Sequence, residues 1–526
     1  MTYRNPISIA PAIPHPAARR LFLRQASALS LVAGAGAPLA LNLLAAGSAA
    51  AQTAPGYRAI VCLFMFGGND GFNTVLPTDS TTWNAYIAMR NQGSSSIALM
   101  PVGMPPNPGS SAGSPARLGG VLPLLPVRPQ SRTFALHPGL GTLQSLFNTE
   151  QRLAVVANIG PLVMPTTKAQ YGQTSHPRPA RLFSHNDQQS TWLTMQPEGA
   201  TLGWGGRMAD MVASGANKAV FTAISATGNA VWLSGEQVRQ YQVSGGGALR
   251  LGADSNNRVY GSDAVASALA NIARSTHGGH VLEADVAAVS DRSIAAEASL
   301  RSGLRPASDA AFGTPPSGGS YNPASDPKLQ YVNPLSGTSE FNPLAQQLQV
   351  VARLVQTGQS GVTGVQRQVF FVSLGGFDTH SNQNPNHANL MARVAHAMAY
   401  FDTALGAINA RNAVTTFTAS DFGRTFTTNG DGTDHGWGSH QFVMGGGVRG
   451  GELYGTLPTL VAKNRNDNEF ASPDQVRNGA LLPTTSVDQL GATLGRWFGL
   501  SDSQTLEVFP NLANFNTGVR NLGFMG

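Results

Sequence analysis

Hydrophobic residues in this chain gather in short continuous runs that alternate with segments of helical spacing. A continuous apolar run is typical of a strand buried on both faces of a sheet. We expect such strands at 58–66, 153–157, 368–374, 414–418 and 441–444. Helical spacing predicts helices at 140–147, 281–300, 344–355 and 386–408. This alternation predicts an α/β fold with a mostly parallel sheet and helices on both faces.

Two further stretches complete the expected organisation. A capping box at Ser486 and Gln489 predicts the final helix, which ends at Phe498. The pattern weakens between 203 and 342, where short apolar runs such as 219–224 are expected strands among glycine-rich loops. We expect a single domain over 52–526, with an insertion or cap around 203–342 and long loops elsewhere.

The first 51 residues carry the pattern of an export signal. Arg19 and Arg20 precede a weakly hydrophobic stretch over 26–46. An alanine-rich segment, typical of a signal-peptide cleavage site, follows it. These features predict a twin-arginine signal peptide, and hence the Tat translocase as an export partner. The alternative is an N-terminal membrane anchor, which the interruptions at Gly34, Gly36 and Pro38 disfavour. We expect a periplasmic or secreted protein without a stable membrane span in the mature chain.

Charge and cysteine content narrow the function classes. Four of the 34 basic residues and none of the 28 acidic residues precede Gln52, so the mature chain carries a net charge near +2. The basic balance of the full chain therefore gives no reason to expect nucleic-acid binding. Cys62 is the only cysteine, so an intramolecular disulfide is impossible. We expect it to be a small buried hydrophobic residue.

Acids and histidines follow several of the predicted strands. In a parallel sheet the carboxyl ends of the strands meet at one edge, so these groups can converge. Carboxylates and neutral imidazoles are ligands for zinc, with manganese, magnesium or calcium as alternatives. The candidate metal ligands are Asp70, Asp378, His380, Asp421, Asp434, His435 and His440.

Each candidate also has a structural alternative. Asp70 and Asn73 could form an Asx-type turn. Ser184, His185 and Asp187 stand too close in sequence for a catalytic triad, because triads are assembled in space. We expect a polar active-site loop in which Ser184 or His185 faces substrate or metal, and Ser184 is the candidate nucleophile. The alternative is a hydrogen-bonded surface turn. Arg424 could neutralise an anionic ester, or could be a structural ion-pair partner.

These motifs together resemble a large family of exported bacterial proteins, the domain-of-unknown-function 1501 family. The resemblance rests on the signal, the Ser184-His185 loop and four motifs, and spans the mature chain from about Tyr57. The motifs are Gly-Gly-Asn-Asp70-Gly-Phe-Asn, Gly-Gly-Phe-Asp378-Thr-His380, Ser-Asp421-Phe-Gly-Arg424-Thr and Thr-Asp434-His435-Gly-Trp-Gly-Ser-His440. The family is grouped by fold with alkaline phosphatases and sulfatases. The resemblance implies a three-layer α/β/α sandwich, alkaline phosphatase-like, with a metal centre at one edge.

Departures from the superfamily pattern bear on the chemistry. Asp70 matches its first-strand metal aspartate, and Asp378 and His380 resemble its later ligand pair at a shorter spacing. Phe422 stands where the superfamily often has a histidine, which puts one of two ion sites in doubt. Cys62 lacks the sequence context of a formylglycine sulfatase.

Two functions remain open at this point. The first is an exported metal-dependent hydrolase of phosphate or sulfate esters, which would act on a small anionic ester. The second is a non-catalytic exported binding or assembly protein on the same fold. The number of ligand-type residues at strand ends favours the enzyme, and the missing histidine and nucleophile favour the binding protein.

Overall fold

The computed structural model describes residues 56–526, apart from 93–94, 129–130, 214–216, 218, 249–257, 277–279 and 467–468. The predicted signal segment, 1–51, lies outside the described residues. The structural unit discussed below spans Pro55–Gly526.

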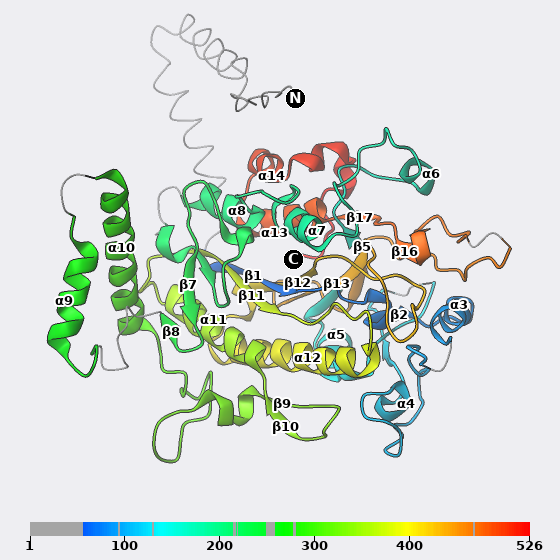
Figure 1. Cartoon of the computed structure of the whole chain (residues 1–526), viewed down its shortest axis with the longest axis horizontal. Coiled ribbons are helices and arrows are strands. Elements are labelled where there is room, and N and C mark those ends of the chain that lie inside the picture. The colour runs from blue at the N-terminus through cyan, green and yellow to red at the C-terminus, as the bar shows by residue number, and fades with distance from the viewer. Residues whose placement is uncertain are drawn as a thin grey trace, which may run out of the picture. The chain divides into compact units, whose positions relative to one another are not determined.

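A ten-stranded sheet forms the centre of this unit (Figure 1). The strands in spatial order are β14 (Glu452–Tyr454), β5 (Leu153–Gly160), β13 (Ser439–Gly445), β12 (Val414–Ser420), β1 (Arg58–Met65), β11 (Arg367–Leu374), β6 (Ala223–Ser225), β7 (Tyr241–Ser244) and β8 (Gly247–Ala248). The short strand β17 (Thr485–Ser486) pairs with β5. All five predicted strands are therefore present.

The sheet is mostly parallel, as predicted. β1 pairs in parallel with both β11 and β12, and β6 extends the parallel array beyond β11. β13 runs antiparallel to its neighbours β12 and β5. Because β13 is reversed, the residues before it lie at the same edge as the residues that follow β11 and β12. This arrangement places the candidate ligands of four segments together.

Helices cover both faces of the sheet (Figure 1). On one face, Ala59, Val61 and Leu63 of β1 belong to a core that includes residues of the helices α5 (Gly141–Asn148), α11 (Pro343–Gln359) and α12 (Gln383–Ala407). On the other face, Ile60, Cys62 and Phe64 belong to a core with α7 (His185–Thr194), α8 (Trp204–Val212) and α13 (Val487–Phe498). Alternate side chains of β1 thus point into the two cores. Because both faces of the strand are buried, its sequence is one continuous apolar run.

The helices agree with the predicted periodicity at most positions. The predicted helix at 281–300 is α10 (Val281–Gly303), and the capping box of Ser486 and Gln489 begins α13. We expected α13 to be the final helix, but α14 (Asp502–Val508) follows it. Ser501 and Gln504 form a second capping box there, the same signal 15 residues after Ser486.

The segment 203–342, where we expected an insertion or cap, contributes to the central sheet. β6, β7 and β8 come from this segment and extend the sheet past β11. Residues Ala219–Phe221 form a 3-10 turn, and the strand begins only at Ala223. Among the described residues, no helix is both long enough and apolar enough to cross a membrane.

Candidate metal centre

Acidic and imidazole side chains from separate segments meet at the carboxyl edge of β11 and β12. They follow β11, follow β12, precede β13 and begin α7. The side chains that contact one another here are His185, Asp378, His380, Asp421, Asp434 and His435. The expected convergence of Asp378, His380 and His435 is present in the structure.

Asp378 lies at the centre of this cluster, and three imidazole rings face its carboxylate through Nε2. Nε2 of His380 and Nε2 of His435 lie 3.1 Å and 3.3 Å from Asp378 Oδ1. Nε2 of His185 lies 3.5 Å from Oδ2 of the same carboxylate. The Nε2 atoms of His380 and His435 are 2.9 Å apart. Three imidazole nitrogens and one carboxylate thus converge.

The other nitrogen of each ring contacts an acceptor. His185 Nδ1 lies 2.8 Å from Oδ2 of buried Asp421, and His435 Nδ1 lies 2.8 Å from the Phe183 carbonyl. His380 Nδ1 lies 3.4 Å from Asp434 Oδ1. An ionised carboxylate and a carbonyl can only accept, so Nδ1 of His185 and of His435 carries the proton. Each Nε2 is then free to offer its lone pair, as in the carboxylate–histidine pairs of known metal sites.

Charge around the cluster also suits a cation. Burial lowers the pKa of His435, which favours its neutral, metal-binding form. The hydrogen bond to Asp421 raises the pKa of His185, which favours its protonated form, so a metal would have to displace a proton there. Burial acts to raise the pKa of Asp378, but the Arg424 guanidinium outweighs it and holds that pKa below its ordinary value. The central carboxylate is therefore ionised at neutral pH.

The donor set fits a divalent ion of the zinc type. Tetrahedral zinc ligands at about 2.0–2.1 Å from the metal lie about 3.3 Å from one another. Nε2 of His380 and of His435 lie 3.1 and 3.3 Å from Asp378 Oδ1, and Nε2 of His185 lies 3.5 Å from Asp378 Oδ2, all near this value. The two Nε2 atoms of His380 and His435 are closer together, at 2.9 Å. His185, Asp378 and His435 each offer a ligand atom within 4.8 Å of the other two. His380, which is more exposed, is not part of this group, but its Nε2 contacts both Asp378 and His435 and would supply a further imidazole donor.

Phe422 and Arg424 form the inner wall of the cluster. The Phe422 ring centroid lies 4.7 Å from that of His185 and 4.5 Å from that of His435. Arg424 is fully buried and donates through one NH2 group to Asp378 Oδ1 at 2.7 Å. Its Nε and its other terminal nitrogen have no hydrogen-bond partner among the described residues. Arg424 therefore contacts the carboxylate from the protein interior.

Glycine is required where the loop after β1 meets the ligand loops. Gly67 has φ of +115°, and a Cβ there would lie 2.4 Å from the backbone nitrogen of Asp378. Its own N–H donates to Asp421 Oδ1 at 3.1 Å. Gly67 thus touches the backbone of one ligand residue and the carboxylate that orients another.

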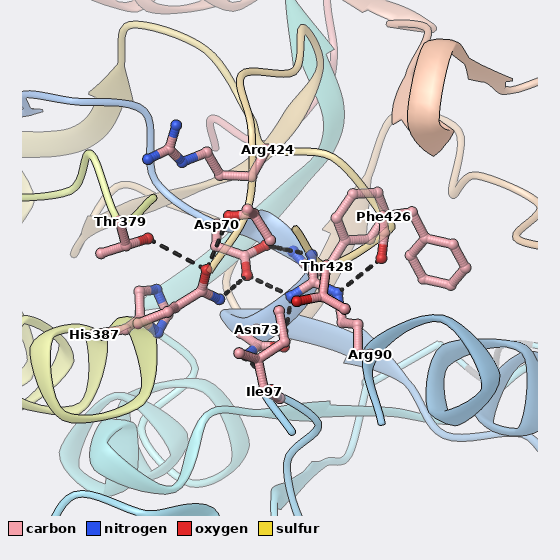
Figure 2. Close-up of polar contacts among 12 residues, drawn as sticks. Asp70, Asn73, Arg90, Ile97, Thr379, His387, Arg424, Phe426 and Thr428 are labelled. Atoms are coloured by element: carbon pink, nitrogen blue, oxygen red, sulfur yellow. Dashed lines mark hydrogen bonds and ion pairs between the residues drawn. The ribbon is translucent and has the colours of Figure 1, made fainter. Parts of the chain in front are cut away.

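Asp70 lies outside this cluster, in a buried ion pair with Arg90 (Figure 2). Both side chains are fully buried, and Arg90 also donates to Asn73 Oδ1 at 2.9 Å. Asp70 Oδ1 accepts from the backbone N–H of Phe72, the capping role that we had kept as its alternative. Burial opposes ionisation of Asp70, but Arg90 outweighs it and holds the pKa of that carboxyl below its ordinary value. Arg90 supplies the positive charge that we had expected from a metal.

Gln383, at the start of α12, joins Asp70 to the two ligand loops. Its Nε2 donates to Asp70 Oδ2 at 2.5 Å. Its Oε1 accepts from Thr379 Oγ1 at 3.3 Å and from Thr433 Oγ1 at 2.8 Å. Thr379 stands between Asp378 and His380, and Thr433 stands two residues before His435. One buried amide therefore holds both loops.

His440 and Ser184 do not join the cluster either. His440 is buried on β13, where its Nδ1 accepts from the Asn158 backbone N–H at 3.2 Å. Burial lowers the pKa of His440 to about 4. The Ser184 hydroxyl donates to buried Asp187 Oδ2 at 3.1 Å. No histidine among the described residues contacts that hydroxyl, so the structure gives Ser184 no general base.

His185 is the cluster residue that we left out of the expected ligand set. We had considered it only as a residue that could face substrate or metal. It opens α7, more than two hundred residues from its partner Asp421 in sequence. Its neighbours Ser184 and Asp187 are of the same polar type, so local pattern alone does not separate them.

Comparisons with known proteins place the chain in a family but give it no activity. Two similar solved structures are titled "Crystal structure of Ps i-CgsB" and "Crystal structure of Ps i-CgsB in complex with k-i-k-neocarrahexaose". Each has a TM-score of 0.32 and 9% identity, and each match covers 88% of this chain and 77% of the other. No curated protein matches. The model of the family described as "Protein of unknown function (DUF1501)" matches residues 57–509, and the chain therefore belongs to that family.

Proposed function

We propose that this protein is an exported metal-dependent hydrolase of phosphate or sulfate esters, with an alkaline phosphatase-like fold. One observation carries the proposal: three Nε2 atoms face one carboxylate, and each Nδ1 contacts an acceptor. This arrangement leaves the Nε2 atoms with lone pairs for one ion. Zinc suits the three imidazoles best.

The residues of the chain divide the work between holding the ion and orienting its ligands. His185, His380, His435 and Asp378 would hold the metal. A bound divalent ion supplies Lewis-acid polarisation of an ester oxygen. Asp421 and Asp434 orient two of the imidazoles. Arg424 is a positioning residue in this proposal, because it is buried and touches Asp378 rather than the open side of the cluster.

A single ion is the stoichiometry that we propose. Among the described residues, one group of at least three acidic, cysteine or histidine side chains has ligand spacing. Asp70, which would serve a second ion, is neutralised by Arg90. Phe422 packs on two of the imidazoles where a further histidine would stand.

A non-catalytic binding or assembly protein remains the second candidate. The observation that favours it is the contact between Ser184 and Asp187, which engages the candidate nucleophile away from the histidines. In that case the ion would hold the loops of a binding surface. Metal content would then be retained without any ester cleavage.

Hydrolysis of 4-nitrophenyl phosphate and 4-nitrophenyl sulfate separates the two candidates. The mature chain is loaded with zinc or manganese and compared with Asp378→Ala and His380→Ala, and with His280→Ala, which changes an exposed histidine before α10. The hydrolase predicts activity in the parent and the control, and at least a hundredfold loss in the other two. Absence of cleavage by a fully loaded parent would favour the binding protein.

We also propose that residues 1–51 direct twin-arginine export to the periplasm or beyond. The support is the Arg19-Arg20 pair before the apolar stretch. Replacement of both arginines by lysine should retain the precursor inside the cell. Unchanged export of that variant would refute the proposal.

A further inference from the structure

A basic cavity adjoins the metal centre. Its volume is about 530 Å³, and its lining includes three arginines and a histidine but no acidic residue. The residues that bear on its chemistry are Tyr171, His176, Arg178, Arg181, Phe183 and Arg477. A cavity with this lining favours an anion over a neutral or cationic ligand.

Two of the guanidinium groups are held in place by aromatic rings. The guanidinium carbon of Arg178 lies 5.2 Å from the Tyr171 ring centroid, and that of Arg477 lies 4.8 Å from the Phe183 ring centroid. Arg178 also donates to the Tyr171 carbonyl at 2.8 Å. Stacking fixes the plane of a guanidinium and leaves its N–H edge free for a planar or tetrahedral oxyanion.

The positive charge of these arginines is not neutralised by close contact with carboxylates. Arg181 is the one lining arginine with a carboxylate nearby, at 3.8 Å from Asp187, and its side chain is 75% exposed. Among the described residues, neither Arg178 nor Arg477 has an ion-pair partner within 4.0 Å. Arg178 is partly buried and Arg477 is exposed, so both guanidinium groups can reach an anion in the cavity.

The wall of the cavity is continuous with the metal centre. Phe183 lines the cavity, and its carbonyl oxygen is the acceptor for His435 Nδ1 at 2.8 Å. His185 follows Phe183 by two residues. Arg181 and Phe183 have φ of 45° and 73°, left-handed conformations that are unfavourable for residues other than glycine. Such strain persists where surrounding structure holds it, which is typical of functional sites.

We propose that this cavity binds a second oxyanionic group of the same substrate. The substrate class is then an ester that carries at least one further sulfate, phosphate or carboxylate beside the ester that is cleaved. Arg178 and Arg477 are its specificity-determining residues. The inference rests on the proposed hydrolase function for the role of the second group, while the anion site itself stands on the cavity.

Anion binding by the metal-free mature protein tests the site without any catalysis. Isothermal titration with inorganic sulfate, inorganic phosphate and acetate, at ionic strength held constant with sodium chloride, measures affinity and shows which oxyanion is preferred. The test variant is Arg178→Gln with Arg477→Gln. The matched control is Arg301→Gln with Arg496→Gln. These two arginines, on α10 and α13, each form an ion pair with an acidic side chain.

We expect one anion site in the parent and the control, and at least a tenfold loss of affinity in the test variant at an unchanged melting temperature. Equal binding by the test variant, or no binding by any of the proteins, would overturn the proposal. With an ester that carries two sulfates, the test variant should also show at least a fivefold higher KM at a similar kcat. If no ester is cleaved, the hydrolase proposal fails while the titration still decides the anion site.

Discussion

Nδ1 of His185 lies 2.8 Å from Oδ2 of Asp421, a carboxylate that is almost fully buried. The two residues are 236 positions apart in the sequence, since His185 opens α7 and Asp421 follows β12. Because the carboxylate only accepts, it fixes the tautomer of the imidazole and directs Nε2 towards Asp378. This contact determines whether His185 can act as a metal ligand.

Asp421→Asn should weaken metal binding about 10–100-fold, because the amide does not hold the tautomer as the carboxylate does. Asp434→Asn should have a smaller effect, since Asp434 is 49% exposed and lies 3.4 Å from His380. Competition with a fluorescent zinc chelator measures both affinities. Equal losses for the two variants would contradict the ranking.

Gln383→Leu should destabilise the protein and weaken the metal site together. The leucine leaves the Thr379 and Thr433 hydroxyls without their shared acceptor and removes a donor to Asp70, at a cost of about 2–4 kcal/mol. Thermal unfolding and zinc affinity are the two measurements. Gln92→Leu, on the exposed surface, is the control. A Gln383 variant with unchanged zinc affinity would show that the amide does not position the ligand loops.

Arg90→Met should be among the most destabilising single changes in the chain. The substitution leaves the buried Asp70 carboxylate without its positive partner, which lowers the free energy of unfolding by about 3–5 kcal/mol. Adding Asp70→Asn should restore part of that loss, because the buried charge is removed as well. The double-mutant cycle is read by urea unfolding. Additive effects of the two changes would show that the ion pair is not the source of the coupling.

Asp488 predicts a pH dependence of stability. Burial raises the pKa of this carboxyl to about 6, although hydrogen bonds from Ser486 and Asn511 oppose the shift. The folded protein then holds the proton more tightly than the unfolded chain does. Its contribution to the free energy of unfolding, at most about 3 kcal/mol, is present below pH 4 and is lost as the pH rises through 6.

Replacement of Asp488 by Asn should remove this dependence. The melting temperature of the parent should fall between pH 4 and pH 6 relative to that of Asp488→Asn, and the variant should be at least as stable as the parent at pH 7. Scanning calorimetry across this range measures the difference. Parallel pH profiles for the two proteins would contradict the assignment.

Much of the fold could be predicted because its strands are buried on both faces. Such strands read as apolar runs, and the runs at β1, β5, β11, β12 and β13 were found. The direction of β13 could not be predicted, because an apolar run does not indicate whether the strand pairs in parallel or antiparallel with its neighbours. The apolar run at 219–224 predicts a strand, and β6 overlaps its end. β7 and β8 are too short for periodicity to identify, so the sequence does not predict that 203–342 extends the central sheet.

The candidate site was predictable to the extent that its residues follow strands. Asp378 and His380 follow β11, and they meet His435, which precedes the reversed strand β13. Asp70 also follows a strand, but Arg90 reaches it from the end of α3 (Ser80–Arg90). The sequence around Asp70 contains nothing that predicts its contact with Arg90. His185 depends likewise on tertiary packing, since Asp421 and Asp378 lie far from it in sequence.

Metal content is the measurement that tests the central claim most directly. The mature protein, purified after export, is analysed by plasma mass spectrometry beside His435→Ala and beside His440→Ala, which changes a buried histidine outside the cluster. We predict about one equivalent of zinc or a similar divalent ion per chain in the parent and in His440→Ala, and less than a tenth of that in His435→Ala. Absence of metal from the parent after reconstitution, or equal content in His435→Ala, would contradict the metal centre.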